Sequence, residues 1–221
     1  MYCKMAVVCL AAALAPVTHA GVVNSDFQTG DLTGWTTYQT ATGTAGSPDF
    51  PKVTLFDVTG GGSSDAATFH VGITSGAGGT SDYEGGGIYQ TVNLAAGSVA
   101  ISFDWAESDT TAQTNSSAGR LELLLDGTVI GTQSDQSILG GQVFRGNLSG
   151  TGNVTAGSHE IRIQVTRNYY QTGEATTPFE YIDNVTVGGG DSTGTPEPDS
   201  SLLILVGMGF LLARRRLKNP V

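Results

Sequence analysis

The chain is poor in cysteine and histidine. Its two cysteines, Cys3 and Cys9, lie in the first nine residues, so residues 21 to 198 contain none. This central region cannot form disulfides and offers no cysteine nucleophile. It also contains no His-Glu-x-x-His motif, and its two histidines, His70 and His159, lie within strand patterns. These absences favour a non-enzymatic protein.

Basic residues are also scarce. The chain has 10 Lys and Arg against 20 Asp and Glu. Residues 21 to 198 hold 19 acidic and five basic residues, a net charge of −14. Such a surface repels phosphate backbones, so we expect no nucleic-acid partner. It suits Ca²⁺, which prefers carboxylate and carbonyl oxygens, although solubility outside the cell is the simpler explanation.

The first twenty residues predict a secretory signal peptide. Lys4 provides a positive charge, residues 5 to 15 are apolar, and Ala20 places a small residue before the expected cleavage point at Gly21. The apolar run is too short for a stable membrane span. The alternative is a buried N-terminal helix. We expect residues 1–20 to form a signal helix and to be removed.

The C-terminal end combines a polar linker, a short apolar run and a basic cluster. Residues 191–198 form the linker and residues 199–221 the tail, in which residues 202 to 213 carry no charge. A helix of this length spans about 18 Å, less than the ~30 Å hydrocarbon core of a bilayer. We expect a hydrophobic helix that is a poor permanent anchor, with its basic end on the cytoplasmic side. The flanking motif residues are Pro196, Glu197, Pro198, Arg214, Arg215 and Arg216.

This order of elements resembles the PEP-CTERM sorting signal of Gram-negative bacteria. The resemblance covers residues 196 to 221: the Pro-Glu-Pro motif, the apolar run and the arginine cluster. It implies export across the inner membrane, transient anchoring in the membrane through the C-terminal helix, and processing by an exosortase, a membrane transpeptidase-like enzyme. It further implies a cell-surface or extracellular product associated with exopolysaccharide and biofilm.

The region between the two ends has no long helical period. Short runs instead alternate between apolar and polar residues, as where Ile101, Phe103 and Trp105 alternate with Ser102 and Asp104. Alternation of this kind is typical of antiparallel sheets with one buried face. The predicted strands are residues 52–58, 66–73, 88–94, 99–106, 120–126, 159–167 and 179–187.

Between these runs the sequence predicts turns and loops. Asp126-Gly127, between Leu125 and Val129, is a hairpin signal. Long loops are expected at residues 41–48, 59–65, 74–87 and 108–118, which are rich in Gly, Ser and Thr. We therefore expect an all-β domain over residues 21–190, namely a β-sandwich.

A second resemblance refines this fold. Residues 24 to 28 followed by Gly34-Trp35, then residues 88–92, and finally residues 181–185 are similar to segments of galactose-binding-like domains, including carbohydrate-binding modules. The resemblance implies a jelly roll of about eight antiparallel strands with the first and last strands adjacent. It also implies a structural Ca²⁺ where these strands meet, as a cofactor. The matching positions are Asn24, Asp26, Gln28 and Asp183.

Sugar binding requires an aromatic face flanked by hydrogen-bonding side chains. The candidates are tyrosines at strand ends and in strands, whereas Trp35 and Trp105 are expected to pack in the core. At least one tyrosine of the Tyr169-Tyr170 pair should face solvent. The tyrosine candidates for carbohydrate binding are Tyr83, Tyr89, Tyr169 and Tyr170.

Three functions follow from these patterns. The first is a non-enzymatic surface or extracellular matrix protein, sorted through its tail and associated with exopolysaccharide. The second is a specific carbohydrate-binding module, with Ca²⁺ dependence as one of its forms. The third is a matrix glycoside hydrolase, for which Asp104 and Glu107 are the candidate carboxylate pair. The absence of other catalytic motifs argues against the third function, and we take the first as the prediction with the second as its alternative.

Overall fold

A computed structural model describes residues 21–46, 49–74, 82–110, 117–169 and 178–189. Within these ranges the chain forms strands and no helix, and therefore no helix that could span a membrane. The predicted signal peptide, linker and sorting tail lie outside the described residues. The expectation of an all-β domain is confirmed.

The first sheet has five antiparallel strands in the order β1-β6-β11-β8-β9. Its strands follow runs of alternating apolar residues, such as Ile161, Ile163 and Val165 of β11, which are all fully buried. The bounds are β1 Thr36–Gln39, β6 Glu84–Leu94, β8 Arg120–Leu125, β9 Thr128–Gln133 and β11 Gly157–Arg167.

The second sheet also has five antiparallel strands, in the order β10-β7-β12-β4-β3. Its central strands β7 and β12 pair along most of their length, with a register shift between Asp183 and Thr186. The bounds are β3 Lys52–Phe56, β4 Ser64–Phe69, β7 Gly97–Ser108, β10 Val143–Val154 and β12 Phe179–Gly189. A separate pair, β2 Gly43–Thr44 and β5 Gly72–Ile73, lies beside the first sheet.

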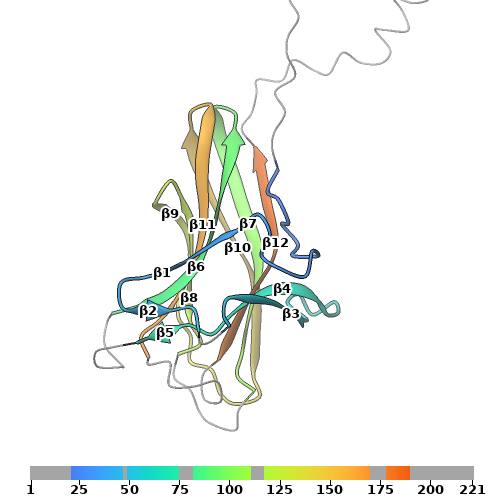
Figure 1. Cartoon of the computed structure of the whole chain (residues 1–221), viewed down its shortest axis with the longest axis vertical. Coiled ribbons are helices and arrows are strands. Elements are labelled where there is room, and N and C mark those ends of the chain that lie inside the picture. The colour runs from blue at the N-terminus through green and yellow to red at the C-terminus, as the bar shows by residue number, and fades with distance from the viewer. Residues whose placement is uncertain (1–20, 47–48, 75–81, 111–116, 170–177, 190–221) are drawn as a thin grey trace, which may run out of the picture.

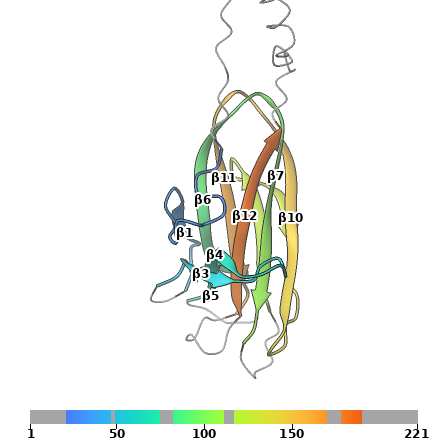
Figure 2. The same cartoon turned by 90° about the vertical axis from the view of Figure 1, so that its right-hand side faces the viewer.

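The two sheets pack face to face, as Figures 1 and 2 show. The core between them contains fully buried residues from both sheets, among them Ile88, Leu123 and Ile163 from the first and Phe103 and Ile182 from the second. Trp35 and Trp105 belong to the same core, which confirms their expected packing role. The sandwich thus leaves one outer face on each sheet for function.

The segment before β1 lies against the last strand. The backbone N–H of Val185 donates to the carbonyl of Ser25 at 2.8 Å, and the indole of Trp35 donates to the carbonyl of Asn24 at 3.1 Å. The ring of Trp35 stacks on Phe27. The expected adjacency of the opening and closing segments is therefore present, although the opening segment is a series of turns before β1.

The strands differ from the sequence prediction in several places, since β1 and β9 also lie outside the predicted strands. The loop expected at residues 74–87 is shorter, because β6 begins at Glu84 and includes Gly85, Gly86 and Gly87. The long strand β10 has no counterpart among the predicted strands, since it is rich in glycine and polar residues. In β10 the missing side chain at Gly146 leaves room for the ring of Trp105, which a Cβ there would approach to 2.7 Å.

Candidate functional site

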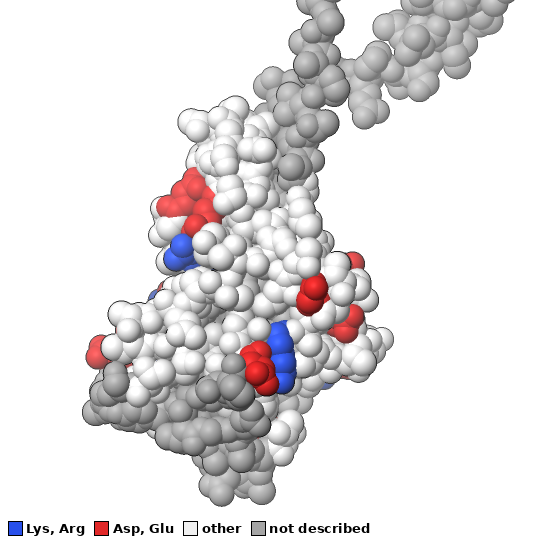
Figure 3. All heavy atoms as spheres, in the orientation of Figure 1, with Lys and Arg blue, Asp and Glu red and all other residues white. Residues whose placement is uncertain are grey.

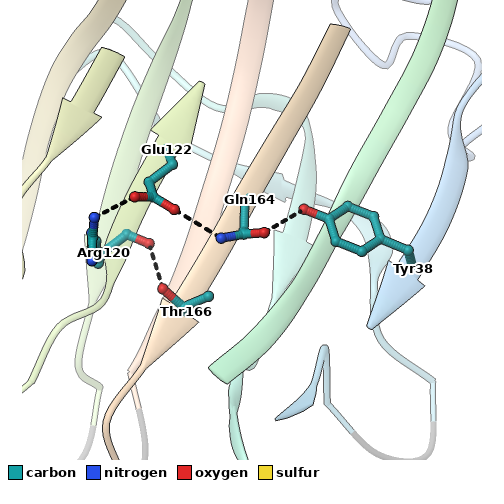
Figure 4. Close-up of polar contacts among 5 residues, drawn as sticks. All are labelled: Tyr38, Arg120, Glu122, Gln164 and Thr166. Carbon is teal, nitrogen blue, oxygen red and sulfur yellow. Dashed lines mark hydrogen bonds and ion pairs between the residues drawn. The ribbon is translucent and has the colours of Figure 1, made fainter. Parts of the chain in front are cut away.

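The outer face of the first sheet carries a row of hydrogen-bonded side chains. Successive side chains of a strand point to opposite faces of the sheet. On the neighbouring strands β11 and β8, Ile163 and Leu123 point into the core, so Gln164 and Glu122 point to the outer face. Tyr38 on β1 and Arg120 on β8 extend the line at its two ends (Figure 4). We call Tyr38, Gln164, Glu122 and Arg120 the polar row.

Hydrogen bonds fix each member of the polar row. The hydroxyl of Tyr38 donates to Gln164 Oε1 at 3.2 Å, and Gln164 Nε2 donates to Glu122 Oε2 at 2.8 Å. Glu122 forms an ion pair with Arg120, whose carbonyl accepts a bond from Thr166 Oγ1 at 3.5 Å. Burial raises the pKa of Tyr38 above its usual range, so its hydroxyl stays a donor at neutral pH.

Arg162 covers two aromatic rings next to the polar row. Its guanidinium carbon lies 4.5 Å from the ring centre of Tyr38 and 5.4 Å from that of Tyr89. Arg162 Nε also donates to Glu160 Oε1 at 2.9 Å. The two tyrosine rings are 6.2 Å apart. The face thus combines aromatic surface, a cation, an amide and a carboxylate held in fixed positions.

Glycines in β6 make this arrangement possible. Gly87 pairs with both Tyr38 on β1 and Gln164 on β11. A Cβ at Gly87 would lie 2.9 Å from the Tyr38 hydroxyl and would collide with the carbonyl of Ile163. The bare backbone lets the Tyr38 side chain lie across β6 and reach Gln164.

The outer face of the second sheet has a groove of about 240 Å³. Its lining combines rings with hydroxyl groups and one ammonium group. The hydroxyls of Thr54 and Thr68 lie 2.6 Å apart, and Lys52 Nζ lies 4.4 Å from the ring centre of Phe50. The lining residues are Phe50, Lys52, Thr54, Thr68, Phe179 and Tyr181.

Stacked rings continue from the groove in two directions. Phe179 stacks on the buried ring of His70 at 4.6 Å, and Tyr181 stacks on Phe56 at 3.7 Å. Burial, together with the charge of Arg167, lowers the pKa of His70 to about 4, so this imidazole is neutral at neutral pH. The groove is therefore a second aromatic and polar surface.

The tyrosines predicted for sugar binding lie in different places. Tyr89 is on the face of the polar row, and Tyr83 lies near its end, with its ring centre 5.6 Å from the guanidinium carbon of Arg120 and its hydroxyl donating to Asp135. Tyr169 is exposed and lies beside Ile73, whose N–H donates to its carbonyl. Tyr170 is outside the described residues. Their role in sugar binding stays a prediction.

The residues predicted to bind calcium are only partly brought together. Burial raises the pKa of Asp183, and the charge of Asp26 is the smallest of the effects that act on it. The Asn24 amide instead donates to the carbonyls of Asp31 and Thr33. The Gln28 amide donates to the carbonyl of Asp26. The calcium set therefore stays a prediction.

Asp183 already has two hydrogen-bond donors. One carboxylate oxygen accepts from Ser64 Oγ at 2.7 Å and the other from the N–H of Asn184 at 2.7 Å. Among the residues that the structure describes, no group of three or more His, Cys, Asp or Glu side chains is arranged to hold a metal ion. A Ca²⁺ ion held by the described residues would thus depend on at most two such carboxylates, with carbonyl oxygens or water.

The carboxylates considered for hydrolysis do not form a pair. Asp104 lies on the outer face of β7, where it accepts from Asn147 Nδ2 at 2.9 Å and Asn184 Nδ2 at 3.0 Å. Glu107 is fully buried, three positions further along the same strand. Because residues an odd number of positions apart on a strand face opposite sides, the two carboxylates cannot flank one glycosidic bond.

Charged residues are sparse on one face of the described surface (Figure 3). The face shown in Figure 3 has few acidic and basic residues, scattered over a largely uncharged surface. A ligand that approaches this face meets mainly neutral side chains. The net charge of the sequence therefore does not exclude an uncharged partner such as a neutral sugar.

Comparison of the sequence with family models and with curated proteins finds no match. Solved structures of similar fold do exist. One is a family 61 carbohydrate-binding module in complex with β-1,4-galactotriose, at 16% identity over 76% of this chain and 97% of the other, with a TM-score of 0.42. Another is the K3 adhesin domain of Lys-gingipain from Porphyromonas gingivalis, at 12% identity over 77% and 100%, with a TM-score of 0.44.

A further similar structure is a family 36 carbohydrate-binding module in complex with calcium and xylotriose. It is 17% identical over 69% of this chain and 99% of the other, with a TM-score of 0.30. Two of these three similar structures are carbohydrate-binding modules.

Sequence reasoning missed the whole polar row. Its members Tyr38, Gln164, Glu122 and Arg120 were not among the predicted site residues, and neither was Arg162. All of these except Tyr38 occupy outward positions of predicted strands. The available signal was the type of those residues: long polar side chains at successive outward positions, next to a tyrosine. Which strands become neighbours decides whether such residues meet, and this information is absent from local alternation.

Proposed function

We propose that the central domain is a non-enzymatic glycan-binding module and that its glycan lies along the polar row. The observation that carries this proposal is the continuous hydrogen-bonded line from Tyr38 through Gln164 to Glu122 on an outer sheet face. Binding sites for small polar ligands place a few fixed donors and acceptors beside aromatic surface. The polar row, together with Arg162 and Tyr89, supplies both.

Hydrogen-bonding capacity remains in these side chains. The Gln164 amide uses one N–H toward Glu122 and accepts one bond from Tyr38, whereas an amide offers two N–H donors and two lone pairs. The guanidinium of Arg162 has five N–H donors, and its ion pair with Glu160 uses its Nε and Nη2 groups. The hydroxyls of a sugar can use the rest. Since the network already fixes these side chains, binding would cost little side-chain entropy.

A glycan array with the purified full-length chain tests this proposal. We expect retention of at least one oligosaccharide and a loss of roughly tenfold or more in affinity for Arg162→Ala and for Gln164→Ala. No retention of any glycan by the wild-type chain would contradict the proposal.

Arg145 provides a matched control on the other sheet. Like Arg162, it is about one-third exposed, lies over an aromatic ring, here Phe56 at 6.0 Å, and pairs with a carboxylate, here Asp57 at 3.7 Å. Arg145→Ala should leave glycan affinity unchanged. If Arg145→Ala and Tyr181→Ala reduce affinity while Arg162→Ala does not, the glycan binds on the second sheet instead.

We also propose that the protein is exported and sorted at its C-terminus. The support is the sequence alone: the signal-like residues 1–20 and the ordered series of Pro-Glu-Pro, apolar run and arginines from residue 196 onward. In this proposal an exosortase removes the tail, and the glycan-binding domain then associates with exopolysaccharide outside the cell. Glycan binding and sorting would together retain the protein in an extracellular matrix.

Intact mass of the protein from culture supernatant and from membranes tests the sorting proposal. We expect a chain that starts near Gly21 and ends near Pro198. Replacement of Pro196, Glu197 and Pro198 by alanine should leave the tail attached. Recovery of the wild-type chain with its complete tail in membranes would contradict processing.

A further inference from the structure

Two buried glutamates lie side by side between the sheets. Glu107 on β7 and Glu180 on β12 are directly paired across the two strands, and both are fully buried. They lie where β7 ends and β12 begins, at the lower end of the sandwich in Figures 1 and 2. Burial of an ionised carboxylate is strongly unfavourable unless a partner compensates its charge. The cost is large compared with the net stability of a folded domain.

Most of the oxygen atoms of this pair lack a hydrogen-bond donor. Among the described residues, neither Glu107 Oε1 nor Glu107 Oε2 has a partner, and the same holds for Glu180 Oε1. The remaining atom, Glu180 Oε2, accepts a bond from the N–H of Val71 at 3.4 Å. Buried carboxylate oxygens without donors are rare in folded proteins and require an explanation.

The unpartnered oxygens converge on one point beside Gly119. A Cβ built on Gly119 would lie 3.3 Å from Glu180 Oε1 and 3.6 Å from Glu107 Oε1. Any larger residue would fill this point, and the backbone of Gly119 has a φ of 134°, which favours glycine. The same Cβ would lie 3.2 Å from Glu180 Cγ, so a side chain here would crowd Glu180, and glycine leaves this point to the two carboxylates.

The surroundings have an excess of negative charge. Asp135 accepts a bond from the N–H of Gly119 at 3.2 Å, and its charge raises the pKa of Glu107, after the larger effect of burial, to about 8. The charges of Asp109 and Asp135 act on Arg167, as do those of Glu107 and Glu180. Four carboxylates thus share one guanidinium.

The guanidinium of Arg167 also serves two backbone carbonyls. Its Nε donates to the carbonyl of Ser117 at 3.0 Å and its Nη1 to that of Val71 at 3.4 Å. A single positive charge, divided in this way, cannot balance the carboxylates that surround it. Either protons or a second cation must do so.

We propose that Glu107 and Glu180 bind a calcium ion in the space beside Gly119. The unpartnered atoms here are carboxylate oxygens, and Ca²⁺ prefers oxygen ligands at about 2.3–2.6 Å in flexible geometry. Its two positive charges match the two glutamates, and carbonyl groups or water would complete the shell. This site is distinct from the predicted set around Asp183, and it does not depend on the glycan proposal.

Calcium binding to the full-length chain tests the site. The chain is purified in detergent, stripped with EDTA and titrated with CaCl₂ by calorimetry, with melting temperature followed in parallel. We expect saturable binding, a higher melting temperature in Ca²⁺, and a loss of roughly 100-fold in affinity for Glu107→Gln, which keeps the shape of the side chain. Glu180→Asp, which keeps the charge but withdraws it by one methylene, should lose affinity to a smaller degree.

Asp104→Asn is the matched control, because it removes a carboxylate of β7 outside this cluster. It should retain the calcium affinity of the wild type. The proposal is overturned if the wild type binds no Ca²⁺. It is equally overturned if Asp183→Asn abolishes binding while Glu107→Gln, folded in EDTA, retains it. Since no glycan is present, neither result depends on whether the polar row binds sugar.

Discussion

The imidazole of His159 donates toward Asp126 across two elements of the first sheet, with 2.7 Å between Nδ1 and Oδ2. On its other side, Nε2 lies 2.8 Å from the carbonyl of Thr155. Both ring nitrogens thus face acceptors, and only the protonated imidazolium can donate to both. Asp126 in turn accepts from the N–H of Glu160 at 2.9 Å, so the β8–β9 turn is attached to β11.

This pair predicts a pH dependence of stability. The hydrogen bond that His159 donates to Asp126 raises the pKa of His159 above its usual value, and the same bond lowers the pKa of Asp126 below its usual value. The contribution of His159 is complete below its unfolded pKa and is lost as the pH rises through the higher folded value. That of Asp126 is lost as the pH falls through its lowered value. The pair should therefore stabilise most between about pH 4 and 6.5.

Asp126→Asn isolates this effect, because asparagine tolerates the φ of 50° at this position and preserves the turn. We expect an NMR titration to give a lower pKa for His159 in the variant. Its melting temperature should fall relative to wild type at pH 5.5 and approach it at pH 8.5. An unchanged His159 pKa in Asp126→Asn would disprove the coupling.

The hairpin that contains Asp126 is a feature that the sequence predicts well. Asp126 and Gly127 both have positive φ, of 50° and 76°, as a two-residue turn between twisted strands requires. The alternation around Phe103 likewise predicts β7, because one buried face imposes a period of two. Local chemistry determines both features, so a single sequence suffices to find them.

Phe103 shows how strongly this core should depend on packing. It is fully buried between the sheets, so Phe103→Ala should lower the free energy of unfolding by about 3–5 kcal/mol. Leu55→Ala is the comparison, since Leu55 is 73% exposed on the edge strand β3 and should change stability by less than about 0.5 kcal/mol. Urea unfolding followed by tryptophan fluorescence measures both. Equal losses would contradict the assigned core.

Strand β10 and the polar row were not predictable in the same way. The glycines of β10 make this segment look like a loop in the sequence. Close contacts from other strands explain them, because the Trp105 ring lies against Gly146 and the Ile130 carbonyl lies against Gly150. The polar row depends on β1, β6, β11 and β8 being consecutive neighbours, although these strands are far apart in the sequence. The cluster of Glu107 and Glu180 is similar, because only the pairing of β7 with β12 brings these carboxylates together.

Gly87 links the stability of the first sheet to the polar row. We expect Gly87→Ala to cost about 1–3 kcal/mol, because its Cβ would collide with the Ile163 carbonyl and press against Tyr38. The contact between Tyr38 and Gln164 should open, so glycan affinity should fall together with stability. Gly188→Ala on β12 is the control, because nothing lies within 4 Å of a Cβ there. Similar melting temperatures for the two variants would refute this packing argument.

Tyr38→Phe separates the polar row from the packing beneath it. The substitution removes only the hydroxyl that donates to Gln164 at 3.2 Å and leaves the ring under Arg162. The free energy of unfolding should fall by about 0.5–1.5 kcal/mol, the net contribution of one such hydrogen bond. Glycan affinity should fall several-fold, because Gln164 loses one of the two bonds that orient its amide.

Gln164→Glu tests the hydrogen bond that orients the Gln164 amide toward Glu122. A glutamate there would still accept from Tyr38, but it would repel Glu122, with which the amide N–H now forms a bond of 2.8 Å. We expect this variant to lose more affinity than Tyr38→Phe, and to recover part of it in the double variant with Glu122→Gln, which restores a donor between the two positions. Isothermal titration with the glycan identified on the array measures the affinity of the wild type, Tyr38→Phe, Gln164→Glu and the double variant. Equal affinity in the single and double variants would mean that the glycan does not contact the Gln164–Glu122 pair.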